Sequence, residues 1–362
     1  MQNELLLSLD RRSCYHEPPA SGLYRTATAL LHAQLSTLSA PGINSRKPMQ
    51  PAVNIIVRTL RNTREHLIDL VNRESLTFSD QQAVSELIRR VNESFHQDVS
   101  RAIERAYPRH TVIAAGGTAP ASAGSPADKG GKAGKAAKSR EDGKAGDRKS
   151  GDAEQLAALT WELMPVHNPI SMVRGWNDWG LSLVAKRGDD IEHAIYFEPI
   201  TGAEYTASRG KSAAKDDRRI RISPQVDLSL SLLTGNLPDI NAEADDADGS
   251  EAEKPNYAKG MQSLAKLTFG FRPGFNAPLA LLQAASNQVD AAVLSRVDMS
   301  ECAAAAFIAQ EAGALLTRFD GTPVNSRTNP RGTAGSPAKA TLICANAKLT
   351  KSLLGQLNNS QR

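Results

Sequence analysis

The stretch Trp161-Glu-Leu-Met-Pro-Val-His-Asn-Pro-Ile-Ser-Met172 decides the fold class of this chain. It separates two parts of different character, because helical spacing of apolar residues precedes it and strand-like alternation follows it. The chain has 362 residues, of which 40% are apolar, so it can build a sizeable core in one large or two modest domains. The elements on either side of the stretch therefore set the architecture.

Two long helical patterns precede the stretch. The first opens at Met49, and the second is expected to begin near Ser79, where Gln82 would complete a capping box. Tyr107-Pro108 ends the second pattern, and residues 110–114 indicate a short strand. The apolar positions that recur at steps of three and four, and so predict the buried faces, are Val53, Ile56, Val57, Leu60, Leu67, Leu70, Val71, Val84, Leu87, Ile88, Val91, Phe95, Val99 and Ile103.

Strand-like segments dominate the part that follows. We expect an antiparallel meander with strands at 179–186, 191–197, 204–207, 219–222 and 226–233. Strands and helices then alternate. Strands are expected at 267–271, 289–294, 314–319 and 340–345, and helices at 277–286 and 300–312. A last helix is expected after Asn346, which would be its N-cap. This order predicts an α/β layered sandwich (αβαβα), with two N-terminal helices, an antiparallel meander sheet and a smaller α/β half.

Two polar inserts interrupt these elements. Residues 116–153 are expected to be a disordered basic insert, because they contain too little apolar surface to offset the entropy of ordering. Within it, Lys129–Lys149 holds eight basic and three acidic residues. An acidic insert spans 241–256, with six acids and one lysine. The expected domains are a loosely ordered extension over 1–48, a helix pair and antiparallel sheet over 49–235, and an α/β layer over 236–357.

Composition excludes several classes of protein. Cys14, Cys302 and Cys344 are odd in number and far apart, which excludes a disulfide framework and favours a reducing cytoplasm. No apolar run reaches the roughly 20 residues that a spanning helix needs, so we expect no membrane contact. The formal net charge of +4 is too small to indicate nucleic-acid binding by itself.

The quoted stretch resembles the inositol monophosphatase signature W-x-[IV]-D-P-[LI]-D-G-T-x-N-F. The resemblance runs from about Met49 to Leu357, outside the two inserts, and implies the sugar-phosphatase fold and a homodimer. Family members usually begin near Met49-Gln50-Pro51, so we expect residues 1–48 to be either a late addition or the product of an upstream start codon. Further matches in the family's order are Phe197-Glu-Pro, Glu204-Tyr-Thr-Ala-Ser-Arg-Gly210, Val289-Asp290 and Glu311-Ala-Gly313.

The resemblance implies Mg²⁺-dependent hydrolysis of phosphate monoesters, in which metal ions activate water and neutralise phosphate charge. The family supplies carboxylates from a Glu-Glu pair, from two Asp in the D-P-x-D-G-T turn, and from a W-D pair. In this chain these positions become Ala115-Gly116, then Met164 and His167, and finally Ser300-Glu301. The Gly-Thr of the turn becomes Asn168-Pro169, and the proline removes one N–H that would face phosphate.

These replacements predict a catalytically inactive pseudoenzyme with no bound metal, because a thioether cannot replace a carboxylate for Mg²⁺. Glu301 is the one retained carboxylate, and a favourable charge near a helix start also explains it. A remodelled Zn²⁺ site is a weaker alternative, with His167, Glu301 and either His110 or His193 as ligands. His167 is otherwise a polar loop residue, and Glu162 is expected to point away from the neighbours of Met164.

Three functions remain open. The first is a pseudoenzyme that acts through protein or RNA-associated contacts, since bacterial relatives are linked to transcription of ribosomal RNA operons. Lys129–Lys149 would then bind RNA or an acidic partner in the transcription machinery, although such segments are more often inert spacers. The second is a Mg²⁺-dependent phosphatase acting on inositol-1-phosphate or a related polyol phosphate. The third is a module that binds such a ligand without hydrolysing it.

Overall fold

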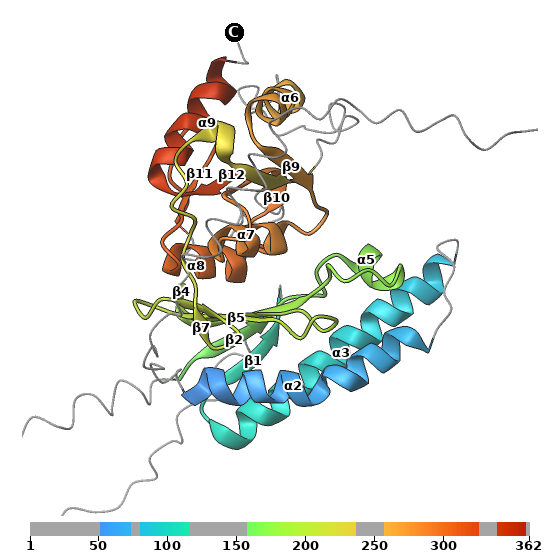
Figure 1. Cartoon of the computed structure of the whole chain (residues 1–362). Coiled ribbons are helices and arrows are strands. Elements are labelled where there is room, and N and C mark those ends of the chain that lie inside the picture. Colours follow the sequence, from blue (N-terminus) through green and yellow to red (C-terminus); the bar gives the residue numbers. More distant parts are fainter. Residues whose placement is uncertain (1–50, 74–79, 116–157, 237–256, 326–338, 360–362) are drawn as a thin grey trace, which may run out of the picture. The chain divides into compact units, whose positions relative to one another are not determined.

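The computed structural model describes residues 51–73, 80–115, 158–236, 257–325 and 339–359. Both expected inserts and the extension over 1–48 lie outside these ranges. In the described part, helices and sheets alternate in layers, so the predicted layered sandwich is confirmed (Figure 1). No helix in these ranges has the length and apolar character that crossing a membrane requires.

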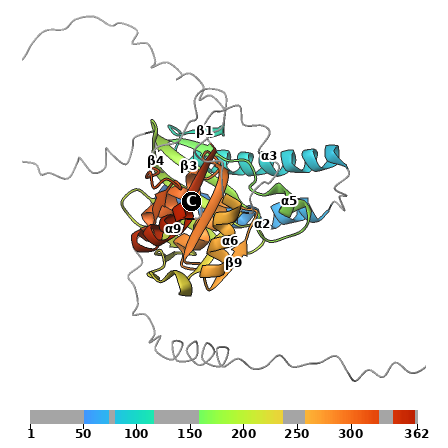
Figure 2. The same ribbon diagram turned by 90° about the horizontal axis from the view of Figure 1, so that it is seen from above.

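The first layer consists of helices α2 (Pro51–Asn72) and α3 (Gln81–Ala106), which lie side by side in Figures 1 and 2. The apolar side of each helix faces the sheet, as the spacing predicts. Phe95 of α3, for example, is only 2% exposed. The predicted cap of α3 is wrong. Asp80 is the N-cap, and its Oδ1 accepts the N–H of Ala83 at 2.9 Å, which a carboxylate does as well as a serine hydroxyl.

The second layer is a seven-stranded sheet in the order β1 to β7. The first two strands are parallel and every later pair is antiparallel, which confirms the meander. Asp216 and Asp217 form the last turn with φ of 49° and 63°, a conformation typical of two-residue hairpins. The strands are β1 (Thr111–Ala114), β2 (Thr160–Leu163), β3 (Leu181–Arg187), β4 (Asp190–Phe197), β5 (Glu204–Ser208), β6 (Ala213–Lys215) and β7 (Arg218–Arg219).

The second sheet has five strands in the order β11-β12-β10-β8-β9. Its members are β8 (Leu232–Gly235), β9 (Gly270–Pro273), β10 (Ala291–Asp298), β11 (Leu315–Thr317) and β12 (Lys339–Ala345). The strand expected at 226–233 of the meander is therefore wrong, since β8 runs parallel to β10 in this sheet. A carboxylate oxygen of Asp290 accepts the N–H of Leu232 at 2.7 Å, which fixes the start of β8 beside β10.

Two helix pairs cover the second sheet. Helices α7 (Ala277–Ala285) and α8 (Ala303–Glu311) match the expected segments and lie between the sheets. On the other face, α6 (Tyr257–Leu267) and α9 (Ala347–Asn359) pack together. The sequence did not predict helix α6. Strand β9 starts at Gly270, three residues later than the expected start at residue 267. Asn346 caps α9 as predicted, accepting the N–H groups of Lys348 and Leu349.

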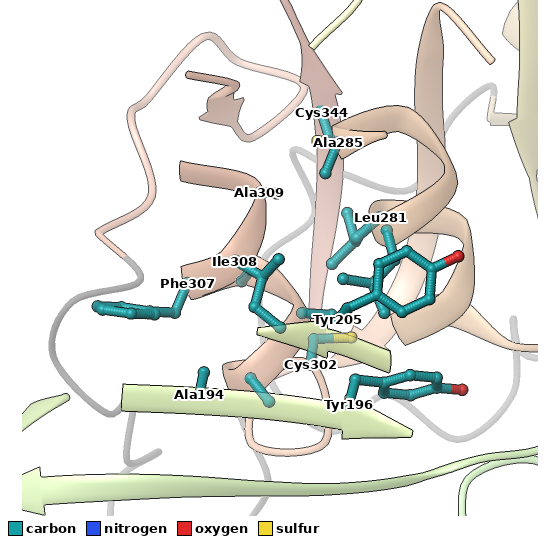
Figure 3. Close-up of a cluster of buried hydrophobic side chains, with 14 of the residues drawn as sticks. Ala194, Tyr196, Tyr205, Leu281, Ala285, Cys302, Phe307, Ile308, Ala309 and Cys344 are labelled. Carbon is teal, nitrogen blue, oxygen red and sulfur yellow. The ribbon is translucent and has the colours of Figure 1, made fainter. Parts of the chain in front are cut away.

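The core has three apolar clusters that follow these layers. One lies between α2, α3 and the first sheet, and another lies between the second sheet, α6 and α9. The largest lies between the two sheets, where Tyr196 from β4 and Cys302, Phe307 and Ile308 from the α8 region come together (Figure 3). This inter-sheet cluster matters for function because the quoted turn contributes a side chain to it.

Candidate functional site

The candidate site is the turn that follows β2. Ala114 pairs with Leu163 across the parallel strands β1 and β2, so Ala115 and Met164 emerge at the same end of the sheet. The N–H of Ala115 donates to the carbonyl of Leu163 at 2.7 Å, and the N–H of Met164 donates to Ser182 at 2.9 Å. The structure therefore brings two of the four sequence-predicted positions together.

Met164 occupies the first of these positions as a core residue. Its side chain is 3% exposed and belongs to the inter-sheet cluster, as does Tyr196. A carboxylate here would lie among apolar side chains, where an ionised group is costly without a partner. The turn therefore contributes packing where the family has a metal ligand.

His167 is also buried, and one of its ring nitrogens has a hydrogen-bond partner. Its Nε2 lies 2.7 Å from Oγ of Ser182, and its ring stacks on Tyr196 with centroids 5.6 Å apart. Burial lowers the pKa of His167 from 6.5 to about 4, because a charged imidazole would lose its hydration. The side chain is therefore neutral at physiological pH. The expected polar loop residue is instead part of the folded interior.

Asn168 and Pro169 replace the segment that holds phosphate in the family. Asn168 has a left-handed backbone, with φ of 55°, and its side-chain amide donates to Oγ of Ser171 at 2.7 Å and to Asp178. Pro169 opens the short helix α5 (Pro169–Val173) and has no N–H. The N–H groups of Ser171 and Met172 donate back to the carbonyl of Asn168. Among the first residues of this helix, Pro169 therefore has no N–H, and the N–H groups of Ser171 and Met172 are already bonded.

A buried network that sequence reasoning missed holds this turn in place. The side-chain amide of Asn276 donates to the carbonyl of Asp178 at 2.8 Å and to the hydroxyl of Tyr196 at 2.9 Å. The side-chain oxygen of Asn92 accepts the N–H of Val166 at 2.9 Å. These partners lie 74 to 98 residues apart in sequence, so no local pattern could identify them.

Gly180 is required by the same packing. A Cβ built at this position would lie 2.4 Å from the hydroxyl oxygen of Tyr196. The ring of Tyr196 is fully buried, and burial is the main cause that raises the pKa of its hydroxyl well above the ordinary value. The tyrosine thus fills the space beside the turn and remains protonated.

The expectation for Glu162 is wrong. Val184, its partner across β3, belongs to the inter-sheet cluster together with Met164, so Glu162 lies on the same face of the sheet as Met164. Its carboxylate is nevertheless engaged, because it forms an ion pair with Lys186 and both side chains are almost fully buried. Glu162 is therefore adjacent to the turn as a paired structural residue.

The zinc alternative is also wrong, because its histidines lie on opposite faces of the sheet. His110 accepts the indole N–H of Trp161 at 3.1 Å, and Trp161 belongs to the cluster that faces α2 and α3. His193 stacks on Trp161, whereas His167 stacks on Tyr196 in the inter-sheet cluster. Within the described ranges, no group of three or more His, Cys, Asp or Glu side chains is arranged to hold a metal.

Glu301 lies two residues before α8. Its side chain is exposed, and partial burial together with the nearby charge of Asp298 raises the pKa of its carboxyl. Asp298 itself accepts hydrogen bonds from the N–H and hydroxyl of Ser300. The residues at the former ligand positions thus offer a methyl group, a thioether, a neutral imidazole and one carboxylate. Mg²⁺ prefers several hard oxygen ligands, so this donor set does not fit it.

The other residues that match the family have structural contacts. Asp290 accepts hydrogen bonds from the hydroxyl of Ser223 and from the N–H of Leu232. Glu204 is 3% exposed and forms two hydrogen bonds with Arg61 of α2. These matches therefore support the fold.

Comparisons with known proteins agree with this architecture. The sequence profile of the inositol monophosphatase family matches residues 49–360. The chain is 26% identical over 274 residues to the Nus factor SuhB of Pseudomonas aeruginosa, covering 76% of this chain and 88% of that protein. It is 22% identical to the Nus factor SuhB of Vibrio cholerae, covering 75% and 87%.

Solved structures show the same fold at lower sequence identity. An IMPase of Thermotoga maritima aligns with a TM-score of 0.56 and 17% identity over 85% of this chain and 97% of that one. The extragenic suppressor protein suhB of Bartonella henselae aligns with a TM-score of 0.57 and 14% identity over 84% and 98%. The profile match covers most of the sequence, including the quoted turn and the scaffold residues around it. The chain therefore belongs to the inositol monophosphatase family.

Proposed function

We propose that this family member lacks phosphatase activity and acts through contacts with the transcription machinery. The observation that carries the loss of activity is the donor set at the former ligand positions. Met164 and His167 are buried and bonded or packed within the fold, and Ala115 has no donor atom in its side chain. Glu301 alone cannot assemble the oxygen-rich shell that Mg²⁺ prefers.

A Mg²⁺ titration by calorimetry, followed by an inositol-1-phosphate assay, tests the loss of activity. We expect no heat of specific binding and no turnover above that of the Glu301→Ala variant, which removes the remaining carboxylate. Mg²⁺-dependent turnover that clearly exceeds this control would instead support the alternative, a phosphatase acting on inositol-1-phosphate or a related polyol phosphate.

The names of the relatives support a role in transcription. Several are called Nus factor SuhB, and the match to two of them covers about three quarters of this chain. We assign the contact with RNA or an acidic partner to Lys129–Lys149, in which basic residues outnumber acidic ones by eight to three. A contact with transcription complexes implies a cytoplasmic location.

Deletion of residues 118–150 tests this assignment. The tagged full chain and the deletion variant would be incubated with transcription complexes assembled from purified components, at low and at high salt. We expect the deletion to weaken retention at low salt, because phosphate and carboxylate contacts are strongest there. Equal retention of both proteins at both salt concentrations would remove this segment from the proposed function.

We also propose that the chain forms a homodimer through an exposed aromatic surface. Trp176 and Phe275 are 49% and 69% exposed, and their rings stack with centroids 6.4 Å apart. Ile170, in the neighbouring helix α5, is also exposed. A contiguous exposed apolar surface favours contact with another protein, and a second copy of the chain is the occupant that we propose.

Sedimentation of the Trp176→Ala/Phe275→Ala variant tests the dimer. We expect it to sediment as a monomer at concentrations where the unmodified chain is dimeric. Leu230→Ala/Phe269→Ala is the matched control, because it also removes two strongly exposed apolar side chains. A dimer that persists in the first variant would contradict this surface.

A further inference from the structure

The open edge of the seven-stranded sheet carries three exposed arginines. Strand β7 is the last strand of this sheet, and it consists of Arg218 and Arg219. Arg221 follows two residues later and is also exposed. We call Arg218, Arg219 and Arg221 the arginine strip. Neither its position nor its residues belong to the former catalytic turn.

The local sequence pattern turns Arg219 and Arg221 away from the core. Ile220 and Ile222 pack against the inter-sheet cluster, and their N–H groups donate to the carbonyls of Ala213 and Ala312. Since side chains alternate along an extended segment, Arg219 and Arg221 lie together on the opposite side. Arg218 lies by the same alternation on the side of Ile220 and Ile222, although its side chain is exposed. The isoleucines therefore anchor the segment, and the sheet edge presents Arg219 and Arg221 on one side and Arg218 on the other.

The positive charge of the strip is not neutralised within the described part of the chain. No ion pair or hydrogen bond joins its three side chains to another described residue. Asp216 and Asp217, the acids of the adjoining turn, already have partners. Asp216 accepts the N–H of Glu204 at 2.9 Å, and Asp217 pairs with Arg61 at 3.3 Å.

We propose that the arginine strip binds the phosphodiester backbone of a nucleic acid. Guanidinium groups suit phosphate oxygens, which they can contact with two parallel hydrogen bonds. None of the large exposed apolar side chains in the described ranges lies within residues 204–221. An interface formed by residues 204–221 alone would lack an apolar anchor, and bases would find no exposed aromatic side chain there for stacking. The strip therefore contacts the backbone without reading the sequence.

This inference deepens the proposed function, on which it rests for the view that the chain works at a nucleic acid. It adds a second, folded contact besides Lys129–Lys149. Two contacts on one chain would raise the apparent affinity for a strand long enough to reach both.

The test uses the full chain and the Arg218→Gln/Arg219→Gln/Arg221→Gln variant. Arg58→Gln/Arg105→Gln/Arg109→Gln is the matched control, since it removes the same charge from three other exposed arginines. Binding would be measured by fluorescence anisotropy to a mixed-sequence single-stranded RNA, to the same sequence as DNA, and to polyglutamate. Circular dichroism would show that all the variants fold.

We expect the strip variant to bind RNA about tenfold more weakly than the control at about 50 mM salt. The slope of log affinity against log salt should also fall by about 2, because three phosphate contacts on a single strand are lost. Comparable losses for RNA and DNA would indicate backbone binding to either, and a loss for RNA alone would identify the sugar as a further contact.

Three other results would overturn the inference. If the strip variant and the control bind RNA equally, the strip is not the contact, whereas the proposed role of Lys129–Lys149 stands. If the strip variant loses polyglutamate binding but keeps RNA binding, the strip fits an acidic protein instead. If the unmodified chain binds neither RNA nor DNA, both the strip and the RNA-associated part of the proposed function fail, while contacts with proteins are still tested separately.

Discussion

At the position of the second turn aspartate, His167 forms contacts that a metal ligand could not keep. Its ring nitrogen bonds to Ser182, its face stacks on Tyr196, and its side chain is 4% exposed. The same low exposure that excludes water also makes a charged imidazole unfavourable. The residue therefore stabilises the fold in its neutral form, and this has a measurable dependence on pH.

We predict that His167 makes the protein less stable in mild acid. Its pKa is about 4 in the folded state and near 6.5 when the chain is unfolded, so the unfolded state binds the proton more readily. Neutral His167 contributes about 3 kcal/mol to the free energy of unfolding. This contribution is complete above pH 6.5 and is lost as the pH falls from 6.5 towards 4. Urea unfolding at a series of pH values would measure this.

The control for this prediction is His167→Gln, which keeps a side chain able to bond Ser182 but cannot take up a proton. His193, whose pKa is also lowered to about 4 mainly by burial, contributes with the same sign and remains in the variant. The difference between the two stability curves therefore isolates His167. A difference that does not change between pH 6.5 and 4 would contradict the prediction.

Sequence reasoning was more informative about what is missing at the site than about what replaces it. The lost ligands could be located because the motif around Met164 and His167 is local and continuous. The contacts of Glu162 with Lys186 and of Asn276 with Tyr196 join separate elements. Predicting them requires the strand register and the packing of α7, which no short motif specifies. The face of Glu162, in contrast, follows from spacing alone, because residues two apart on a strand share a face and Met164 is two residues on.

At the scale of elements, helix α2 is attached to the first sheet by two arginines on one side. Arg61 contacts both carboxylate oxygens of Glu204, and Arg64 donates to the carbonyls of Pro199 and Ile200 at 2.6 and 2.7 Å. Gly202 completes the turn with φ of 74°. These polar contacts fix the position of α2 along the sheet, which apolar packing alone leaves free to slide.

We predict that Arg61→Met destabilises the protein by about 2 kcal/mol, because Glu204 would remain buried without its partner. The loss is smaller than for a fully buried pair, since the side chain of Arg61 is 52% exposed and water can reach it. Chemical denaturation would measure the change. The double variant Arg61→Met/Glu204→Gln should recover part of the stability, and a double variant less stable than Arg61→Met would contradict this account.

The sequence predicted long elements better than short ones. Helices α2 and α3 could be recognised because their apolar residues repeat over several turns. Residues 226–233 were assigned to the meander because strand spacing does not say which sheet a strand joins. The structure shows that hydrogen bonds from Asp290 and pairing with β10 decide this for β8. Helix α6 was missed because it directly follows the acidic insert.

At the scale of the whole described molecule, the turn that follows β2 belongs to the layer between the two sheets. Met164 packs in the same cluster as residues of α7, α8, β10 and β12. In an active family member, this position must instead present a carboxylate to metal ions. An apolar side chain at this position stabilises the core, whereas a carboxylate would be needed to bind metal. In this chain, Met164 stabilises the core.

We predict that restoring the two turn aspartates will not restore a Mg²⁺ site. Met164→Asp/His167→Asp should lower the free energy of unfolding by at least about 3 kcal/mol, because it introduces carboxylates among buried apolar groups. Met164→Leu is the control and should cost less than about 1.5 kcal/mol, since it conserves size and polarity. Pro169 and the bonded N–H groups of Ser171 and Met172 remain, so these three residues would still offer phosphate no free N–H. Unfolding curves of the double variant with and without Mg²⁺ test this prediction. Substantial stabilisation by Mg²⁺ would contradict it. It would mean that the fold still provides a metal site from which only two side chains were lost.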